Sequence, residues 1–463
     1  MCVPILVELV LTGSFQINDF LLPIGGGTFV GGMLFFANKK PSITQIKTAD
    51  AFLLTSLTWL IVPIFSCLPF YCCQSLNLSF IDSWFEAVSS LTATGCKVIP
   101  DLSQMPRWIT TWRFLLSYIG GIGMIIMGMT VLPMLKVGGM QLFQTESSGK
   151  NEKITSSTAK MATLIIAMYS VLIMLSFILL KMSGLSVGDS LCYAISSIST
   201  SGLSIHSDSV ASLNNTFSEL AILISMVLGG SSFILFIKIA KGNFSLLKTD
   251  QQFKGYLKTL LVFSLILFCL RYYNSDAHLL QCIKDGFFNA VSFITTTGFY
   301  NSKYETWGSF AVVFFPLISL IGGCTGSTAG GIKIFRWQLI FSCVKAHINQ
   351  LRRPHCVIKP VYNHLQLSEA TSSSMFVFVF LYVASILITS FLLSLYNLDF
   401  ASSVSAAISA VGNVGIGIGP FVGTNGSVVA IANGAKIILI ISMIIGRLEL
   451  LTLLALFQPS FWK

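Results

Sequence analysis

Four short apolar segments of this chain end in small residues and a glycine, and this repeat restricts the fold more than any other feature. The segments are Ser90 to Gly95, Ser197 to Gly202, Ser292 to Gly298 and Ala410 to Gly415. A half-helix of about 11 residues spans only ~16 Å, about half of the ~30 Å hydrocarbon core of a bilayer. Irregular backbone at that depth is tolerated only where it is buried in protein or lines a wet cavity. We therefore expect the four segments to meet around one axis.

The composition is that of a multi-pass membrane protein. Hydrophobic residues make up 54% of the 463 residues and charged residues 10%, and the mean hydropathy is +0.80. A soluble globular domain has roughly 25% charged residues. Apolar stretches long enough for membrane helices are predicted at 19–37, 51–71, 114–134, 161–180, 218–240, 257–273, 309–322 with a continuation past 332, 374–396 and 428–457.

The net charge of +10 is a topology signal, because Lys and Arg in short loops stay on the cytoplasmic side. The basic residues lie in clusters between apolar stretches and form no basic domain, which argues against nucleic-acid binding. Consecutive clusters stay on one side if each pair is separated by a helix, a short helix that dips into the membrane, and a second helix. The predicted fold is an all-α polytopic membrane protein with four tandem helix, pore-helix and helix repeats around a central pore.

The predicted organisation follows from this repeat. A partial N-terminal pair of extra membrane helices, the first of them truncated, occupies 1–47. The four repeats are predicted at 48–137, 155–242, 255–350 and 368–458.

An aspartate lies 13 residues before the final glycine in three of the segments: Asp82, Asp189 and Asp285. Asp is a favoured N-cap, so the spacing predicts that these residues begin the short helices. In the fourth segment Asp399 lies 13 residues before Gly412 and 16 before Gly415. Either glycine could be equivalent to the other three, and the residues around Gly415 match the other segments better.

The pattern is typical of a cation selectivity filter built from backbone carbonyls. Each short helix directs the negative end of its dipole at the pore, and glycine permits the dihedral angles needed beyond it. The segments carry no carboxylate, which argues against a divalent-cation site, and no transition metal is expected. The predicted filter residues are Ala93, Thr94, Gly95, Cys96, Thr200, Ser201, Gly202, Leu203, Thr296, Thr297, Gly298, Phe299, Asn413, Val414, Gly415 and Ile416.

A glycine-rich stretch, 321–333, interrupts the second helix of the third repeat. Each helical glycine costs ~1 kcal/mol relative to Ala, so the helix is expected to break beneath the filter. The spacing Gly326-x4-Gly331 resembles a nucleotide P-loop, but Ile332 replaces the required Lys. The stretch is either an intracellular gate or a static kink. As a gate, its residues are Gly322, Gly323, Gly326, Gly330, Gly331 and Lys333.

Two charged residues within apolar segments are also candidates for a role in the pore. Arg447 lies in the last membrane helix, where a charge is costly enough to suggest function. It either faces the cavity as part of the gate or is neutralised by a neighbouring helix or by Glu449. Glu86, in the first pore helix, is expected to be a structural glutamate and has no counterpart in the other repeats.

These motifs resemble the Trk/Ktr/HKT superfamily of potassium transporters, and most closely its bacterial TrkH-type subunit. The matching residues run almost the full length of the chain: Phe85-Glu86 to Gly95, Gly120 to Gly123, Gly138 to Leu142, Ile321 to Lys333, Gly446 to Glu449, and Phe457 to Trp462.

The resemblance implies potassium uptake across the bacterial inner membrane, with K⁺ as the transported ion and no permanently bound cofactor. It also implies a homodimer, a gating loop at Gly322 to Lys333, and a cytosolic TrkA-like subunit that binds NAD or another nucleotide and controls the gate. A glycine in all four segments is similar to the potassium-selective members of the family.

Two other classes of function remain to be weighed. A proton- or sodium-coupled symporter would work by alternating access around the broken helix, but the histidines lie in predicted loops or at the ends of spans. An enzyme would need a nucleophile, metal or acid-base group, and the sequence offers no such constellation. We therefore expect a transporter and not an enzyme.

Overall fold

The computed structural model describes residues 18–37, 48–99, 105–128, 158–275, 277–356, 358–363, 365–420, 422–424 and 428–448, together with 3–5, 8–9 and 426. Several sequence predictions lie outside these residues: most of the N-terminal truncated helix, the motif at 138–142, Glu449, and the motif at 457–462. The predicted ends of the repeats at 47, 137, 155 and 458 also lie outside them. The repeat boundaries stay a prediction.

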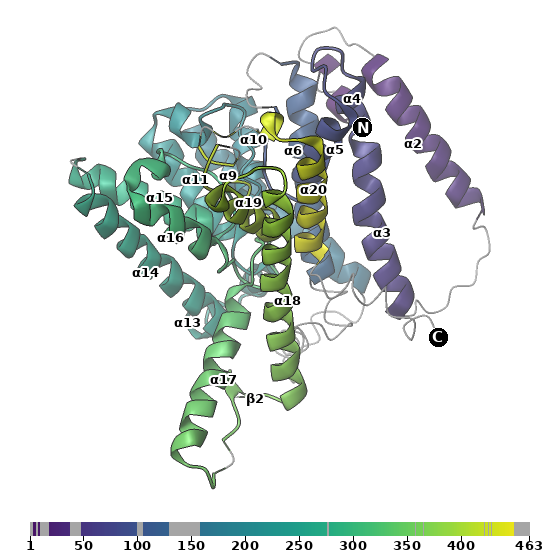
Figure 1. Cartoon of the computed structure of the whole chain (residues 1–463). Helices are drawn as coiled ribbons and strands as arrows, with labels where there is room; N and C mark the ends of the chain where they lie inside the picture. Colours follow the sequence, from purple (N-terminus) through teal and green to yellow (C-terminus); the bar gives the residue numbers. More distant parts are fainter. Residues whose placement is uncertain are drawn as a thin grey trace.

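The described chain is almost entirely helical and repeats a long helix, a short helix and a second helix (Figure 1). The preceding helix is α2 (Asn18–Ala37). Unit 1 contains α3 (Thr48–Ser66), α4 (Leu68–Cys72), the short helix α5 (Phe80–Leu91) and α6 (Arg107–Ile126). Unit 2 contains α9 (Thr158–Met182), the short helix α10 (Val187–Ile198), α11 (Thr216–Gly229) and α12 (Phe233–Ala240).

Units 3 and 4 follow the same order. Unit 3 contains α14 (Gln251–Tyr273), the short helix α15 (Leu279–Ile294), α16 (Ser309–Ser319) and α17 (Ile334–Arg352). Unit 4 contains α18 (Glu369–Ser394), the short helix α19 (Phe400–Gly412) and α20 (Asn433–Leu448). The connections hold α13 (Leu246–Thr249), three 3₁₀ turns, at 209–213, 304–307 and 428–430, and a two-stranded ladder of β1 (Val361–Tyr362) and β2 (Leu365–Gln366).

Five described helices are long and apolar enough to cross a membrane, and a sixth crossing results if α11 and α12 count as one. These two helices meet at 92°, so the continuous helix predicted at 218–240 is wrong. The bend lies at Gly229 and Gly230, where another chain segment comes close. A Cβ on Gly229 would lie 2.7 Å from the Ile198 carbonyl oxygen, and the Gly230 carbonyl accepts a hydrogen bond of 2.8 Å from Cys324 N. The predicted break in the third unit is confirmed, since α16 ends at Ser319 and α17 begins at Ile334.

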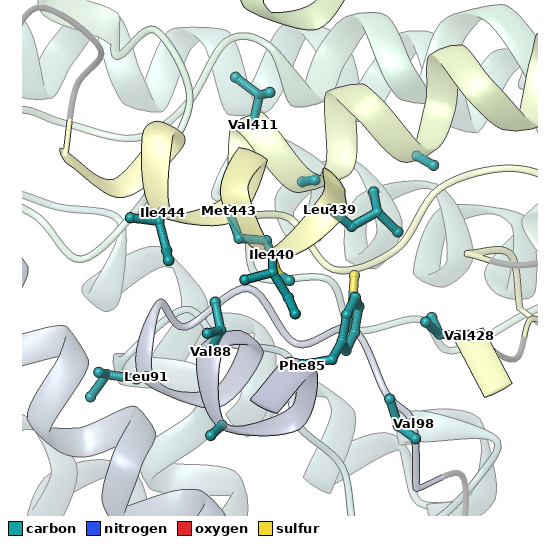
Figure 2. Packing of buried hydrophobic residues seen from close by; sticks show 14 of the residues in the cluster. Phe85, Val88, Leu91, Val98, Val411, Val428, Leu439, Ile440, Met443 and Ile444 are labelled. Atoms are coloured by element: carbon teal, nitrogen blue, oxygen red, sulfur yellow. The ribbon is translucent and has the colours of Figure 1, made fainter. Parts of the chain in front are cut away.

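The four units pack in a closed cycle. Helix α6 of unit 1 contacts α10 of unit 2, α11 of unit 2 contacts α15 of unit 3, and α16 of unit 3 contacts α19 of unit 4. Helix α20 of unit 4 returns to α5 of unit 1. In Figure 2, Phe85 and Val88 of α5 face Leu439, Ile440 and Met443 of α20, all of them buried. Burying an apolar side chain of this size contributes about 1.5–3 kcal/mol, so this contact closes the ring with a substantial apolar interface.

The short helices begin differently from the prediction. The N-caps of α5 and α10 are Ser79 and Ser186, whose side chains accept hydrogen bonds from Asp82 N and Asp189 N in the first turn. Asp285 lies within α15 and is buried, so it caps no helix. Of the four aspartates only Asp399 is an N-cap, and its carboxylate accepts from Ser402 N. The predicted N-cap role of Asp82, Asp189 and Asp285 is therefore wrong, because a preceding serine or an earlier helix start takes the cap position.

A buried ion pair joins the first short helix to the helix that follows it. Arg113 Nε of α6 lies 2.5 Å from Glu86 Oε1 of α5, and both side chains are 0% exposed. The other guanidinium nitrogens of Arg113 make no hydrogen bond in the described part of the chain. Removal of one member of such a pair leaves a buried charge uncompensated, which costs about 3–5 kcal/mol. Glu86 is thus a structural residue, as predicted, and it is desolvated rather than solvated.

We expect Glu86→Gln to lower the unfolding temperature of the detergent-solubilised protein markedly, because it leaves the Arg113 charge unpaired. The double variant Glu86→Gln/Arg113→Met removes both charges and should lose less stability than the sum of the two single variants. Thermal unfolding followed by tryptophan fluorescence measures both. A double variant whose loss equals that sum would show that the two side chains are not coupled.

Candidate functional site

The four predicted glycines lie in a closed ring. Gly95, Gly202, Gly298 and Gly415 all have a positive φ, of 88°, 63°, 85° and 84°. At each one an added Cβ would overlap the carbonyl oxygen of a residue in the next unit. The overlapping oxygens, in the order of these glycines, are those of Ser201, Thr297, Val414 and Thr94. The four segments therefore contact one another in the order 1, 2, 3, 4 and back to 1, and only glycine leaves room for each contact.

A second left-handed residue precedes each glycine by two positions. Ala93, Thr200, Thr296 and Asn413 have φ values of 52°, 51°, 53° and 52°. Positive φ is rare for residues other than glycine and is an outlier for β-branched Thr. Such strain costs about 1–3 kcal/mol per residue and collects at functional sites. Our sequence reasoning assigned the unusual backbone to the glycines alone and missed this second position.

A serine six residues before each glycine ties the turn to its helix, and sequence reasoning missed it. Its carbonyl oxygen accepts a hydrogen bond from the backbone N–H of the residue just before the glycine. The four serines are Ser89, Ser196, Ser292 and Ser409, and the four bonds are 2.9–3.0 Å long. The hydroxyls of Ser89 and Ser292 also donate to the carbonyls of Cys96 and Phe299, at 2.7 and 2.6 Å. The signal was present in the sequence as a serine at one constant spacing.

The chain that leaves each glycine is held to the same short helix by a polar side chain about nine residues before the glycine. Glu86 Oε2 accepts from Val98 N at 2.9 Å, and Ser405 Oγ accepts from Ile418 N at 2.6 Å. In units 2 and 3 the contacts join side chains, Tyr193 to Ser204 at 3.0 Å and Asn289 to Asn301 at 2.8 Å. The position shifts by one residue in unit 4 and the residue type differs in every unit, which explains why no sequence motif revealed these contacts.

The fourth segment keeps this geometry with a different hydrogen bond. The hydroxyl pairs Thr92–Thr94, Ser199–Ser201 and Thr295–Thr297 brace units 1 to 3 at 2.7–3.1 Å. Unit 4 has Gly412 and Val414 at the equivalent positions, and Asn413 Nδ2 instead donates to Thr94 Oγ1 of unit 1 at 2.9 Å. Gly415 has the positive φ and the ring contact, whereas Gly412 is the last residue of α19. The caps Ser79, Ser186 and Asp399 all lie 16 residues before their glycines, which accounts for the offset noted in the sequence.

The other predicted segment residues are buried around the ring. Leu203, Phe299 and Ile416, which follow three of the glycines, are 0–7% exposed. Cys96 Sγ approaches the carbonyl of Gly415 at 3.5 Å, across the boundary between units 1 and 4.

A cavity of about 260 Å³ opens on one side of the ring. We call it the outer mouth, since the positive-inside rule places this side away from the basic loops. Its lining comes from all four units: Gly95, Cys96, Lys97, Ser207, Asp208, Tyr300, Gly415, Ile416, Val422, Gly423, Thr424, Gly426 and Val428.

The glycine-rich stretch of unit 3 folds into a closed loop on the other side of the ring. Backbone hydrogen bonds of 2.9–3.0 Å join its two ends, from Ile332 N to Leu320 O, Lys333 N to Ile321 O and Ile334 N to Gly323 O. The ends are close enough that a Cβ on Gly331 would lie 2.8 Å from the Cα of Gly322. Gly322, Gly326, Gly331 and also Lys333 have positive φ values of 73–77°. The loop is thus an ordered element with a strained lysine at its end.

This loop contacts the ends of three of the four short helices. Gly330 N donates to Thr296 Oγ1 of unit 3 at 2.7 Å, and an added Cβ on Gly330 would overlap the carbonyl of Gly412 in unit 4. Thr328 Oγ1 lies 2.8 Å from Ile198 O and 3.2 Å from Thr200 Oγ1, both in unit 2. The loop therefore lies directly beneath the ring.

Arg447 connects the loop to unit 1. Its side chain is 1% exposed, and Nη1 donates to Thr328 O at 3.1 Å while Nη2 donates to Gly120 O at 3.3 Å. The guanidinium also lies 5.9 Å from the centre of the Trp59 ring. Arg447 is therefore held by backbone carbonyls of two units, and one of them belongs to the loop. The charge and the loop therefore form one assembly.

Metal-ligating side chains do not gather here. Within the described ranges, no group of three or more His, Cys, Asp or Glu residues could hold a metal ion. The ring offers neutral backbone oxygens and hydroxyls, which suit a hard cation.

Comparisons with known proteins identify the family. The family described as TrkH, cation transport protein, matches residues 27–271 and 276–463. The Trk system potassium uptake protein TrkI of Halomonas elongata is 33% identical over 90% of this chain and 85% of its own length. Trk system potassium uptake protein TrkG of Escherichia coli K12 is 32% identical over 94% of this chain and 89% of its own length.

A solved structure has the same fold along the whole chain. The crystal structure of the potassium transporter TrkH from Vibrio parahaemolyticus superposes with a TM-score of 0.91 at 26% identity. The match covers 100% of this chain and 96% of the other. It confirms the predicted all-helical, multi-pass membrane architecture, and the family assignment confirms a transporter and not an enzyme. The chain belongs to the TrkH family of cation transport proteins.

Proposed function

We propose that this chain takes up potassium ions through a selectivity filter formed by the ring of four glycine segments. The observation that carries the proposal is the closed cycle of contacts between each glycine and a carbonyl oxygen of the next unit. Four short helices end at this ring, so the negative ends of their dipoles favour a cation there. Neutral oxygens without a carboxylate suit a monovalent ion. The relatives named as potassium uptake proteins indicate which one.

Uptake through such a pore needs no coupled reaction. The transmembrane potential contributes about 2.3 kcal/mol per charge at 100 mV and draws cations inward. We therefore favour a gated conductance over a proton- or sodium-coupled symporter, and the inner membrane as its location.

The loop at 321–333 and Arg447 are proposed as the gate. The loop lies beneath the ring and is hydrogen-bonded to units 2 and 3, while Arg447 of unit 4 donates both to the loop and to Gly120 O of unit 1. Opening must break these bonds. A hydrogen bond to a charged group is worth about 1.5–3 kcal/mol, so the two Arg447 contacts alone favour the closed position considerably.

Control by a cytosolic nucleotide-binding subunit of the TrkA type, and a homodimeric assembly, complete the proposal. Helix α17 begins directly after Lys333 and projects with α18 beyond the rest of the bundle (Figure 1). A partner that moves α17 would therefore pull on the loop itself.

Rubidium uptake into proteoliposomes of the purified chain tests the transport function. We expect downhill uptake driven by a potential alone, with no sodium or proton gradient, and competition by potassium. Rubidium uptake that requires a proton or sodium gradient in addition to the potential would instead establish symport.

We predict that Gly415→Ala abolishes potassium-selective uptake while Gly412→Ala preserves most of it. Gly415 has a φ of 84° and no room for a Cβ, whereas the nearest neighbours of an added Cβ on Gly412 are side-chain atoms at 3.2 and 3.4 Å. Rubidium and sodium uptake by the two variants, at equal protein amounts, provides the measurement. Equal loss in both would refute the assignment of the fourth filter glycine. Gly95→Ser should resemble Gly415→Ala.

We predict that Arg447→Gln raises uptake in the absence of a cytosolic partner by on the order of tenfold or more, because it releases the loop from Thr328 O and Gly120 O. Lys436→Gln is the matched control. It removes another buried cation of α20, whose ammonium pairs with Asp82 of α5 at 2.6 Å and donates to Val429 O at 3.1 Å. An Arg447→Gln protein that is folded but leaks no more than wild type would indicate a static kink rather than a gate.

A further inference from the structure

The chain that leaves the filter glycine of unit 3 reaches across to the chain that leaves the filter glycine of unit 4. We call residues 300–305 of unit 3 the clamp, and the described residues between 417 and 424 of unit 4 the outer loop. Tyr300 Oη of the clamp lies 2.8 Å from Thr424 O of the outer loop and 3.0 Å from Ser207 O of unit 2. The clamp therefore joins three units at the outer mouth.

Two other clamp residues hold the outer loop more directly. Tyr304 Oη donates to Gly417 O at 2.5 Å. Glu305 Oε1 accepts from Gly419 N at 3.0 Å, and its Oε2 accepts from Thr424 Oγ1 at 3.0 Å. Hydrogen bonds to an ionised acceptor are roughly twice as strong as neutral ones. Since Gly417 lies only two residues beyond the filter glycine of unit 4, the clamp acts directly next to the filter.

The clamp is itself fixed to the core of unit 3. Tyr304 is fully buried, and its ring centroid lies 5.1 Å from that of Phe293 in α15 and 4.8 Å from that of Phe315 in α16. Trp307, at the end of the same 3₁₀ turn, also packs on Phe315, at 5.5 Å. Such aromatic pairs stabilise a structure beyond the area that they bury. The clamp is thus a firm support that carries the position of unit 3 over to the outer loop.

Unit 4 is the unit whose filter segment has no hydroxyl pair within its turn. Units 1 to 3 have such a pair, whereas unit 4 has Gly412 and Val414 at the two positions. On the side of unit 1, Asn413 donates to Thr94 Oγ1. On the side of unit 3, the clamp holds the chain just beyond the glycine. The filter segment of unit 4 therefore takes its position from both neighbouring units.

We propose that Tyr304 and Glu305 are positioning residues that set the ion selectivity of the filter. They fix the segment of unit 4 at the distance from unit 3 at which the ring of carbonyls fits a potassium ion. The carboxylate of Glu305 acts through its two hydrogen bonds and not through an effect of its charge on the ion. A segment released from the clamp lets the ring adapt to the smaller sodium ion. The proposal rests on the filter function proposed above.

The test is the ratio of rubidium to sodium uptake by proteoliposomes at one fixed membrane potential. The ratio compares two ions in the same molecules, so a lower yield of folded protein does not change it. Tyr304→Phe removes the bond to Gly417 O and keeps the ring contacts, and Glu305→Ala removes both of its bonds. We expect the ratio to fall roughly two- to tenfold in Tyr304→Phe, the effect of one neutral hydrogen bond, and further in Glu305→Ala.

Glu305→Gln separates position from charge. Its amide oxygen can accept from Gly419 N while its amide nitrogen donates to Thr424 Oγ1, so both contacts persist without the charge. We expect a ratio close to that of wild type. Tyr118→Phe is the matched control for the loss of a phenol. Tyr118 Oη lies 3.0 Å from Ser170 Oγ, between α6 and α9, and does not line the outer mouth, so this variant should leave the ratio unchanged.

Three results would overturn the proposal. An unchanged ratio in either Tyr304→Phe or Glu305→Ala would show that the clamp does not set selectivity. A ratio in Glu305→Gln as low as that in Glu305→Ala would assign the effect to the charge. An equal fall in Tyr118→Phe would assign it to a general loosening of the protein. Failure of the underlying filter function is distinguishable, because wild type would then show no rubidium uptake, or Gly415→Ala would keep the wild-type ratio.

Discussion

The structure depends on the close approach of each filter glycine to a carbonyl oxygen of the next unit. None of the four segments could hold its backbone in this form alone, because each contains two left-handed residues and buried peptide groups. The neighbouring unit supplies the packing that stabilises them. The other helices support this contact, since in each pair of consecutive units, and in the pair of last and first, a helix that follows the short helix of one unit packs against the short helix of the next. The conformational strain of the left-handed residues at the axis is thus offset by the burial of apolar side chains around it.

The same requirement explains the polar interior. A membrane protein cannot leave peptide groups unsatisfied in hydrocarbon, so the departing chain in each unit needs a hydrogen-bond partner. In units 1 and 4 a side chain of the short helix accepts from that backbone, Glu86 from Val98 N and Ser405 from Ile418 N. In units 2 and 3 Tyr193 and Asn289 bond side chains of the departing segment instead. In unit 1 the solution is a carboxylate, which in turn needs Arg113. The requirement for a hydrogen-bond acceptor beside the first filter segment thereby accounts for the buried ion pair between α5 and α6.

The sequence predicted the architecture well, because hydropathy and the repeated glycine report directly on membrane span and backbone conformation. It also predicted the helix break in unit 3, where several glycines act together. It failed at the caps, since Ser79 and Ser186 compete with the first-turn aspartates for the same amides. It failed at α11 and α12 because a bend at Gly229 is set by contacts from Ile198 and Cys324, which are distant in sequence. The contact of Arg447 with Thr328 was likewise invisible, as the two lie in different units.

A single loop beneath a fourfold ring has a consequence for symmetry. In an assembly of four identical subunits every unit would carry the same loop, and four such loops would compete for one space on the axis. Here the units are joined in one polypeptide, so one can give up its regular helix to form the loop while another bends to receive it at Gly229 and Gly230. The covalent linkage allows the repeats to diverge in role without losing their common frame. Among the described residues, the units differ in this way at the loop, at Arg447 and at Asn413.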